Sequence, residues 1–145
     1  MKPMPMTTRL ALLGAIPFIF SALLLSLDIL NLPVLGSVAN LLGSYTLVIA
    51  VFMCGVHWGQ YLQQAGDRAS NLLIISNVLT VLLWIVWLIV PIDIFLMLAL
   101  TVFLILLYID MRLRMGGIIS KNYFRTRLLV TTVVCACLLL SIYAI

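Results

Sequence analysis

Five long apolar stretches follow one another along the chain, separated by short polar or charged segments. A transmembrane helix needs about 20 consecutive, mostly apolar residues. The pattern therefore predicts an all-α fold, a polytopic transmembrane helical bundle with five spans in a single domain over residues 1–145. The predicted spans cover approximately residues 10–28, 38–62, 71–90, 92–111 and 127–145.

Two of the predicted turns depend on residues that interrupt helices. Residues 71–109 contain one charged residue, Asp93, and as a single helix they would extend about 58 Å at 1.5 Å per residue. That is almost twice the roughly 30 Å thickness of the hydrocarbon core. Pro91 supplies a turn before Asp93, because a proline disfavours the helical conformation at the preceding residue. An uncharged segment with Asn, Pro and Gly, residues 31–37, separates the first two spans.

The positive charges all fall on one side of this arrangement. With five spans the termini lie on opposite sides, and the other side receives only Asp28 and Asp93. The N-terminal side receives every lysine and arginine: Lys2, Arg9, Arg68, Arg112, Arg114, Lys121, Arg125 and Arg127. Because cytoplasmic segments are enriched in Lys and Arg, we expect a cytoplasmic N-terminus, an external C-terminus and a basic cytoplasmic loop at residues 110–127.

The composition agrees with a membrane protein and argues against other classes. Hydrophobic residues make up 66% of the chain and charged residues 8%, whereas soluble domains carry about 25% charged residues. The net charge of +4 is explained by topology, so nucleic acid is not an expected partner. The first apolar run is longer than a signal-peptide core and should be retained. No Arg- and Ser-rich transit segment precedes it, which favours a multi-pass protein of the bacterial inner (plasma) membrane.

The residue types needed for metal, disulfide or catalytic chemistry do not occur in suitable patterns. The three cysteines, Cys54, Cys135 and Cys137, lie inside apolar stretches, and an odd number does not form a disulfide framework. One histidine, His57, cannot hold a structural zinc, so no metal site is predicted. No Ser-His-Asp set, paired intramembrane carboxylates or phosphate loop is present, so no catalytic residue is predicted and an enzyme is not expected.

The second span contains the most informative polar cluster. Gly55 and Gly59 are four residues apart on one face, a spacing that lets helix backbones approach closely. His57 lies on the opposite face, followed there by Gln60 and Tyr61. The histidine could bond a neighbouring helix, contact a ligand or cofactor, or carry protons. Helix packing is therefore expected at the glycines and polar contacts at the opposite face.

Other polar residues occur near the same predicted membrane boundary. In the first span, Gly14 and Pro17 are expected to produce a packing kink. Asn77 in the third span lies at a depth similar to His57. The basic residues after the fourth span, including Arg112 and Arg127, either set the topology and attract anionic headgroups or bind a phosphate or carboxylate.

Three stretches, residues 14–18, 55–59 and 110–131, match in order and spacing a family with a glycine-flanked His-Trp pair. By these residues the chain resembles the transmembrane protein 69 family, a domain-of-unknown-function family found in proteobacteria and mitochondria. Asn122 departs from the pattern, because an aromatic residue is expected before Tyr123. The resemblance implies a small polytopic membrane protein without an assigned activity, whose three matching stretches form one polar corner near the cytoplasmic side.

These observations predict a binding or accessory/assembly protein. The polar corner would hold a lipid, a quinone, a haem or a partner subunit, and membrane lipids are the expected partners; the cofactor is unknown. The candidate ligand-binding residues are His57, Trp58, Tyr61, Asn77, Asp110, Arg112, Tyr123 and Arg127. The alternative is a small membrane transporter or channel, but ionisable residues are nearly absent from the spans, which counts against ion coupling.

Overall fold

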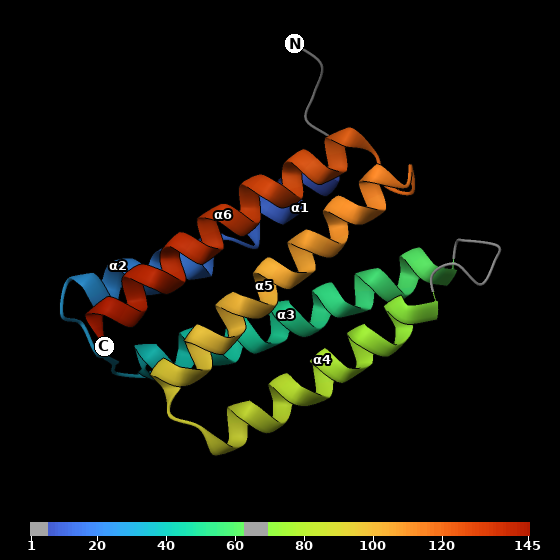
Figure 1. The fold of residues 1–145 in the computed structure, drawn as a ribbon. Helices are drawn as coiled ribbons and strands as arrows, with labels where there is room; N and C mark the ends of the chain where they lie inside the picture. Colours follow the sequence, from blue (N-terminus) through green and yellow to red (C-terminus); the bar gives the residue numbers. More distant parts are fainter. Residues whose placement is uncertain (1–5, 63–69) are drawn as a thin grey trace, which may run out of the picture.

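The computed structural model describes residues 6–62 and 70–145, which form six helices and one short hairpin (Figure 1). In chain order these are α1 (Met6–Leu13), α2 (Ile16–Ser26), β1 (Asn31–Leu32), β2 (Gly36–Ser37), α3 (Val38–Leu62), α4 (Ser70–Ile89), α5 (Ile92–Met115) and α6 (Lys121–Ala144). The helices α1 and α2 follow one another within one span, and five spans are long and apolar enough to cross a membrane. The predicted five-span helical bundle is confirmed.

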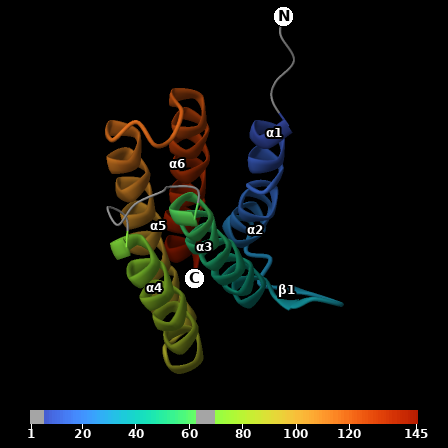
Figure 2. The same cartoon turned by 90° about the vertical axis from the view of Figure 1, so that its right-hand side faces the viewer.

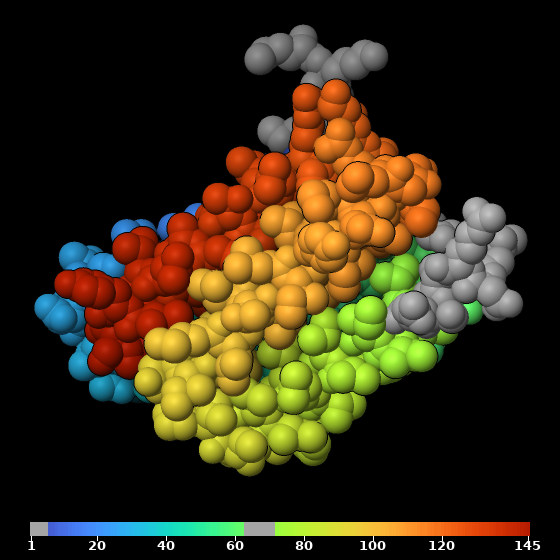
Figure 3. Space-filling view, in the orientation of Figure 1, coloured from blue at the N-terminus to red at the C-terminus, as the bar shows by residue number. Residues whose placement is uncertain are grey.

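The helices α3 and α6 each pack against three other helices. The helix α3 packs against α2, α4 and α5, while α6 packs against α1, α2 and α5. Figure 2 shows α1 and α2 on one side of the molecule and α4 on the opposite side. On the face seen in Figure 3, α5 lies between α6 and α4. This arrangement leaves α1 packed mainly on α6, with few contacts to α3.

Aromatic and aliphatic side chains fill the centre of the bundle. Phe18 of α2 is completely buried and lies edge-on to Phe103 of α5 and Tyr45 of α3, with ring centroids 6.3 and 5.1 Å away. Large apolar side chains such as Leu82 and Leu139 are exposed on the outer surface. An apolar exterior of this kind is stable when hydrocarbon surrounds it, because no apolar surface then faces water.

The first span is broken between α1 and α2. Pro17 lies in the first turn of α2, where its missing N–H costs no hydrogen bond, whereas in a continuous helix its ring would clash with the carbonyl of Leu13. The Tyr45 hydroxyl donates a hydrogen bond of 3.0 Å to the Gly14 carbonyl at the break. A side chain of α3 thus satisfies a backbone acceptor that the interrupted helix leaves open.

Several helix ends differ from the sequence prediction. The predicted basic loop over residues 110–127 is wrong, because α5 continues to Met115 and α6 already begins at Lys121. The Ser120 side chain accepts a hydrogen bond from the backbone N–H of Tyr123 and caps α6. The first span also starts earlier, at Met6 rather than residue 10. The prediction ended helices at charged residues, but a charged residue can continue a helix when its side chain reaches water or an ionic partner.

The glycine of α3 that permits close helix packing is Gly43. A Cβ atom built there would overlap the side chains of Trp87 and Ile92, whereas at Gly55 or Gly59 it would meet no described atom within 4 Å. The predicted packing at Gly55 and Gly59 is therefore wrong for the described part of the chain. Spacing alone indicates which glycines share a face, but the neighbouring helix decides which face is used.

Replacing Gly43 with alanine should destabilise the protein by about 1–3 kcal/mol, the usual cost of overpacking. The Trp87 ring packs edge-on against Phe95 at 4.9 Å and cannot move aside without losing that contact. Gly55→Ala is the matched control on the same helix and should be neutral or slightly stabilising, since alanine favours the helix by roughly 0.5–1 kcal/mol. Thermal unfolding in detergent measures both variants, and equal midpoints would contradict the packing assigned to Gly43.

Candidate functional site

Three ionisable side chains from three helices meet inside the bundle. Asp110 of α5 is completely buried, while His57 of α3 is 2% exposed and Arg127 of α6 is 8% exposed. The His57 Nε2 atom lies 3.0 Å from Oδ1 of Asp110, and Nε of Arg127 donates to Oδ2 at 2.8 Å. We refer to these three residues as the Asp110 cluster.

The Asp110 cluster satisfies its buried charge internally. A buried carboxylate without partners would cost several kcal/mol, whereas here both oxygens accept a hydrogen bond from a charged or polar group. With a neutral imidazole, the carboxylate and the guanidinium cancel and the cluster has no net charge. The imidazole then donates through Nε2, and its buried Nδ1 has no hydrogen-bond partner among the described residues.

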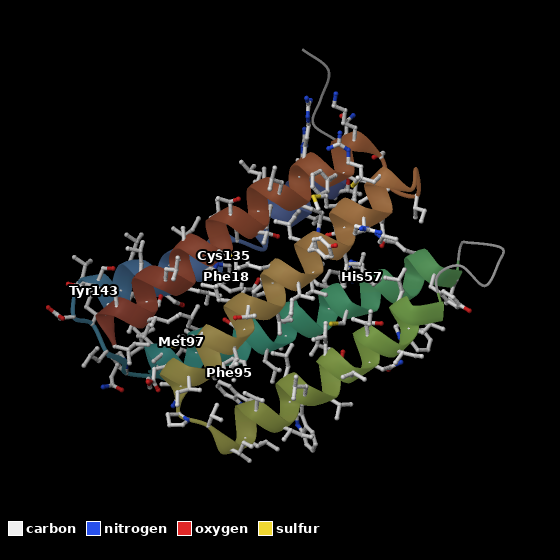
Figure 4. The ribbon with its side chains drawn as sticks, in the orientation of Figure 1. Phe18, His57, Phe95, Met97, Cys135 and Tyr143 are labelled. Carbon is white, nitrogen blue, oxygen red and sulfur yellow. The ribbon has the colours of Figure 1, made fainter. Side chains whose placement is uncertain are left out.

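Further polar side chains surround Arg127. Its Nη1 atom contacts the sulfur of Met53, one turn before His57 on α3. Tyr123 is one turn before Arg127 on α6, and both residues line one cleft. Figure 4 places His57 on α3 toward the end of the bundle where α5 and α6 are joined, and Tyr143 near the opposite end. The polar groups are therefore concentrated at one end of the bundle.

A cleft of about 650 Å³ lies between α1, α3 and α6 and includes Arg127 in its wall. Its remaining lining residues are Thr7, Thr8, Leu10, Ala11, Gly14, Phe18, Ile49, Phe52, Met53, Val56, Ser120, Asn122, Tyr123, Thr126, Val130 and Val134. We refer to this space as the α1/α3/α6 cleft. Its volume falls in the range of small-molecule sites, about 300–1,000 Å³.

The α1/α3/α6 cleft is polar at one end and apolar over the rest of its length. The polar end lies between the N-terminal parts of α1 and α6, where the hydroxyls of Thr8 and Thr126 are 3.2 Å apart. Farther from this end the lining becomes apolar, with Phe18 of α2, Ile49 of α3 and Val134 of α6. A polarity gradient along the helix axes parallels that of the surrounding membrane, from the water boundary to the hydrocarbon.

Four of the predicted ligand-binding residues come together in the structure. His57, Asp110 and Arg127 form the buried cluster, and Tyr123 lies beside it and lines the cleft with Arg127. The matching stretches that contain these residues therefore meet, because α3, α5 and α6 are neighbours. Only Tyr123 and Arg127 of the four are in the wall of the cleft.

The other four predicted ligand-binding residues do not join this site. Trp58 is 40% exposed on α3, and Arg112 is exposed on α5. Asn77 is also exposed, and its side-chain amide donates to a backbone carbonyl of its own helix at 2.9 Å. Tyr61 packs in a separate small apolar cluster with residues of α4 and α5. A similar depth in the membrane does not bring residues together when their helices turn them to different sides.

Sequence reasoning did not find the contribution of the first helix. Thr8 and Thr126 are 118 residues apart and lie on helices whose pairing no local pattern indicates. Met53 was missed because a thioether beside a guanidinium has no sequence signature. The only available signal was Thr7 and Thr8 before the apolar run, which is also compatible with an ordinary helix start.

The cysteines are free in the structure. Cys54 and Cys137 are buried and Cys135 is partly buried, as expected for side chains that fill apolar space. Within residues 6–62 and 70–145, no group of three or more His, Cys, Asp or Glu side chains is arranged to hold a metal ion.

The fold and the site together define a multi-pass helical membrane protein with a buried ionic cluster beside an amphipathic cleft. The chain belongs to the family described as protein of unknown function DUF3429, which matches residues 3–143. No curated protein and no solved structure matches it. The resemblance to the transmembrane protein 69 family stays a prediction.

Proposed function

We propose that this protein is a binding or accessory protein that holds one amphipathic membrane molecule in the α1/α3/α6 cleft. The observation that carries the proposal is the polarity of the cleft, which runs from hydroxyl groups and Arg127 at one end to aromatic and aliphatic side chains at the other. A molecule with a polar head and an apolar tail matches this gradient. Ligand sites are typically apolar with a few polar groups that orient the ligand.

The polar end offers hydrogen-bond donors to such a head group. A guanidinium has five N–H donors, and Arg127 uses Nε for Asp110, which holds the planar group in one orientation at the cleft wall. Tyr123 lines the same cleft, whereas the Thr126 hydroxyl already donates to the Asn122 carbonyl of its own helix. The Asp110 cluster therefore acts as a buried support that positions Arg127, and no bond-making step is required of it.

The contacts of α1 favour entry from the membrane. The helix α1 packs on α6, makes few contacts with α3, and is separated from α2 by the break at Gly14. A ligand could therefore pass from the hydrocarbon into the cleft between α1 and α3. We place the polar end of the cleft at the cytoplasmic boundary of a bacterial inner membrane, following the distribution of basic residues.

The geometry favours an amphiphile over the other occupants suggested by the sequence. A haem would need an accessible imidazole nitrogen, but Nε2 of His57 is bonded to Asp110, its Nδ1 is buried, and the imidazole does not line the cleft. A transported ion would need ionisable groups along a path. Among the described residues that line the cleft, Arg127 is the only ionisable one apart from the Tyr123 phenol.

Filling the cleft should weaken binding. Ala11→Trp introduces a large ring into the cleft wall, and we expect binding of added monoolein, followed by native mass spectrometry of the delipidated protein, to weaken about tenfold or more, since overpacking costs about 1–3 kcal/mol. Ala136→Trp is the control, because Ala136 is exposed on α6 and lines a different, shallow groove. Equal binding by wild type and both variants would contradict this location.

A further inference from the structure

The charge at the polar end of the cleft is already balanced. Among the described residues that line the cleft, Arg127 is the only Lys or Arg, and its guanidinium is paired with the fully buried carboxylate of Asp110. The second carboxylate oxygen is occupied by His57. With a neutral imidazole, a ligand head group at this end therefore meets an assembly without net charge and not an unpaired cation.

Two exposed basic residues at this end, Arg9 and Arg125, point away from the cleft. Arg9 is exposed and stands two positions from Thr7 and from Ala11, which line the cleft. Two positions correspond to about 200° around a helix, so Arg9 is on the opposite face of α1. The same spacing separates the exposed Arg125 from Tyr123 on α6. These cations are placed to contact water and headgroups outside the bundle.

The remaining polar groups in the cleft wall are uncharged. They are the side chains of Thr7, Thr8, Ser120, Asn122, Tyr123 and Thr126. Hydroxyl and amide groups of this kind pair well with carbonyl and hydroxyl oxygens, whereas a buried anion needs a compensating charge that is not already committed. A phosphate placed beside Arg127 would also lie near the negative carboxylate of Asp110.

From these placements we infer that the cleft selects an uncharged amphiphile whose head accepts hydrogen bonds, and rejects the same molecule bearing a phosphate. This inference rests on the proposed function and adds the class of ligand. Quinones and glycerides with free hydroxyls share this chemistry. Asp110 does not touch the ligand; it is a positioning residue that sets selectivity by neutralising Arg127.

A matched ligand pair tests the inference. Monoolein and oleoyl lysophosphatidate have the same tail and glycerol and differ by the phosphate. Delipidated wild-type protein should bind monoolein at least about tenfold more tightly than lysophosphatidate, with little change as salt is raised, because salt screens only interactions between charges. Decylubiquinone is the third ligand and distinguishes a quinone from a glyceride as the bound molecule. Stronger binding than monoolein indicates a quinone, and weaker binding indicates a glyceride.

Asp110→Asn should reverse the preference. Asparagine keeps the shape of the aspartate side chain and removes its charge, so Arg127 becomes an unpaired cation. The affinity for lysophosphatidate should therefore rise at least about tenfold relative to the affinity for monoolein. Asp93→Asn, at the start of α5 and far from the cleft lining, is the control and should behave as wild type. If Asp110 had only a structural role, Asp110→Asn would lower the affinity for both ligands equally.

The outcomes separate this inference from the proposed function. Equal or tighter binding of lysophosphatidate by wild type, or binding that weakens with salt, overturns the selectivity while the cleft remains a binding site. Binding of none of the three ligands overturns the proposed function as well. If Asp110→Asn does not fold, the wild-type ligand pair and its salt dependence still decide the question.

Discussion

Replacing either Asp110 or Arg127 with leucine will destabilise the protein by about 3–5 kcal/mol, and replacing both together will cost far less than the sum. Each single variant leaves the other charge buried without its partner, whereas the double variant removes both charges. The residues are ideal for this comparison, because Nε of Arg127 lies 2.8 Å from Oδ2 of Asp110 and both side chains are buried. The double variant should still be less stable than the wild type, because His57 also loses its hydrogen-bond acceptor.

A double-mutant cycle measures this coupling. Reversible unfolding of wild type, both single variants and the double variant, in one detergent, gives the interaction energy directly. The control cycle uses Asp93 and Arg112, which lie near opposite ends of α5 and should be additive. Additive losses for Asp110 and Arg127 would show that the ion pair does not stabilise the fold as the geometry indicates.

Reporter fusions at the two termini will be found on opposite sides of the membrane, the N-terminal fusion in the cytoplasm and the C-terminal fusion outside. The expected difference is all-or-none, because an odd number of spans separates the ends. Orientation follows from the basic residues, since Arg112, Arg114 and Lys121 all lie close to the connection between α5 and α6.

Internal insertions provide the control for this topology. A reporter in the α5–α6 connection, residues 116–120, should share the compartment of the N-terminus, because the N-terminal parts of α1 and α6 are in contact through Thr8 and Thr126. A reporter in the hairpin between β1 and β2 should share the compartment of the C-terminus. Finding both termini in one compartment would contradict the five-span topology and the proposed cytoplasmic position of the cleft's polar end.

The number and order of the spans could be predicted because hydrocarbon imposes a simple requirement. Each crossing needs a continuous helix whose backbone bonds are satisfied internally, so a long apolar run is sufficient to identify it. The second span was predicted with the observed bounds, Val38–Leu62. The errors lie at Met6, Met115 and Lys121, where helices extend beyond the apolar run into residues that contact water or ionic partners.

The individual contacts of the helices could not be predicted in the same way. The spacing of Gly55 and Gly59 is suitable for close packing, but the close approach occurs at Gly43, against Trp87 and Ile92. A periodic pattern specifies the face of a helix and contains no information about which neighbour covers it. Asn77 illustrates the same point, since its depth resembles that of His57 but it is exposed on α4.

For this protein, the sequence by itself determined a membrane-spanning, all-helical chain and a short set of polar residues that had to find partners. These results follow from local properties, the length and polarity of each segment, which hydrocarbon selects directly. The resemblance implied that the stretches with His57, Asp110 and Arg127 form one polar corner, but only the tertiary structure decided that both carboxylate oxygens of Asp110 are bonded, to residues 53 and 17 positions away. The tertiary structure also placed the first helix beside α6 to form the cleft. Such long-range pairings depend on how helices pack and rotate against each other, which no single segment encodes.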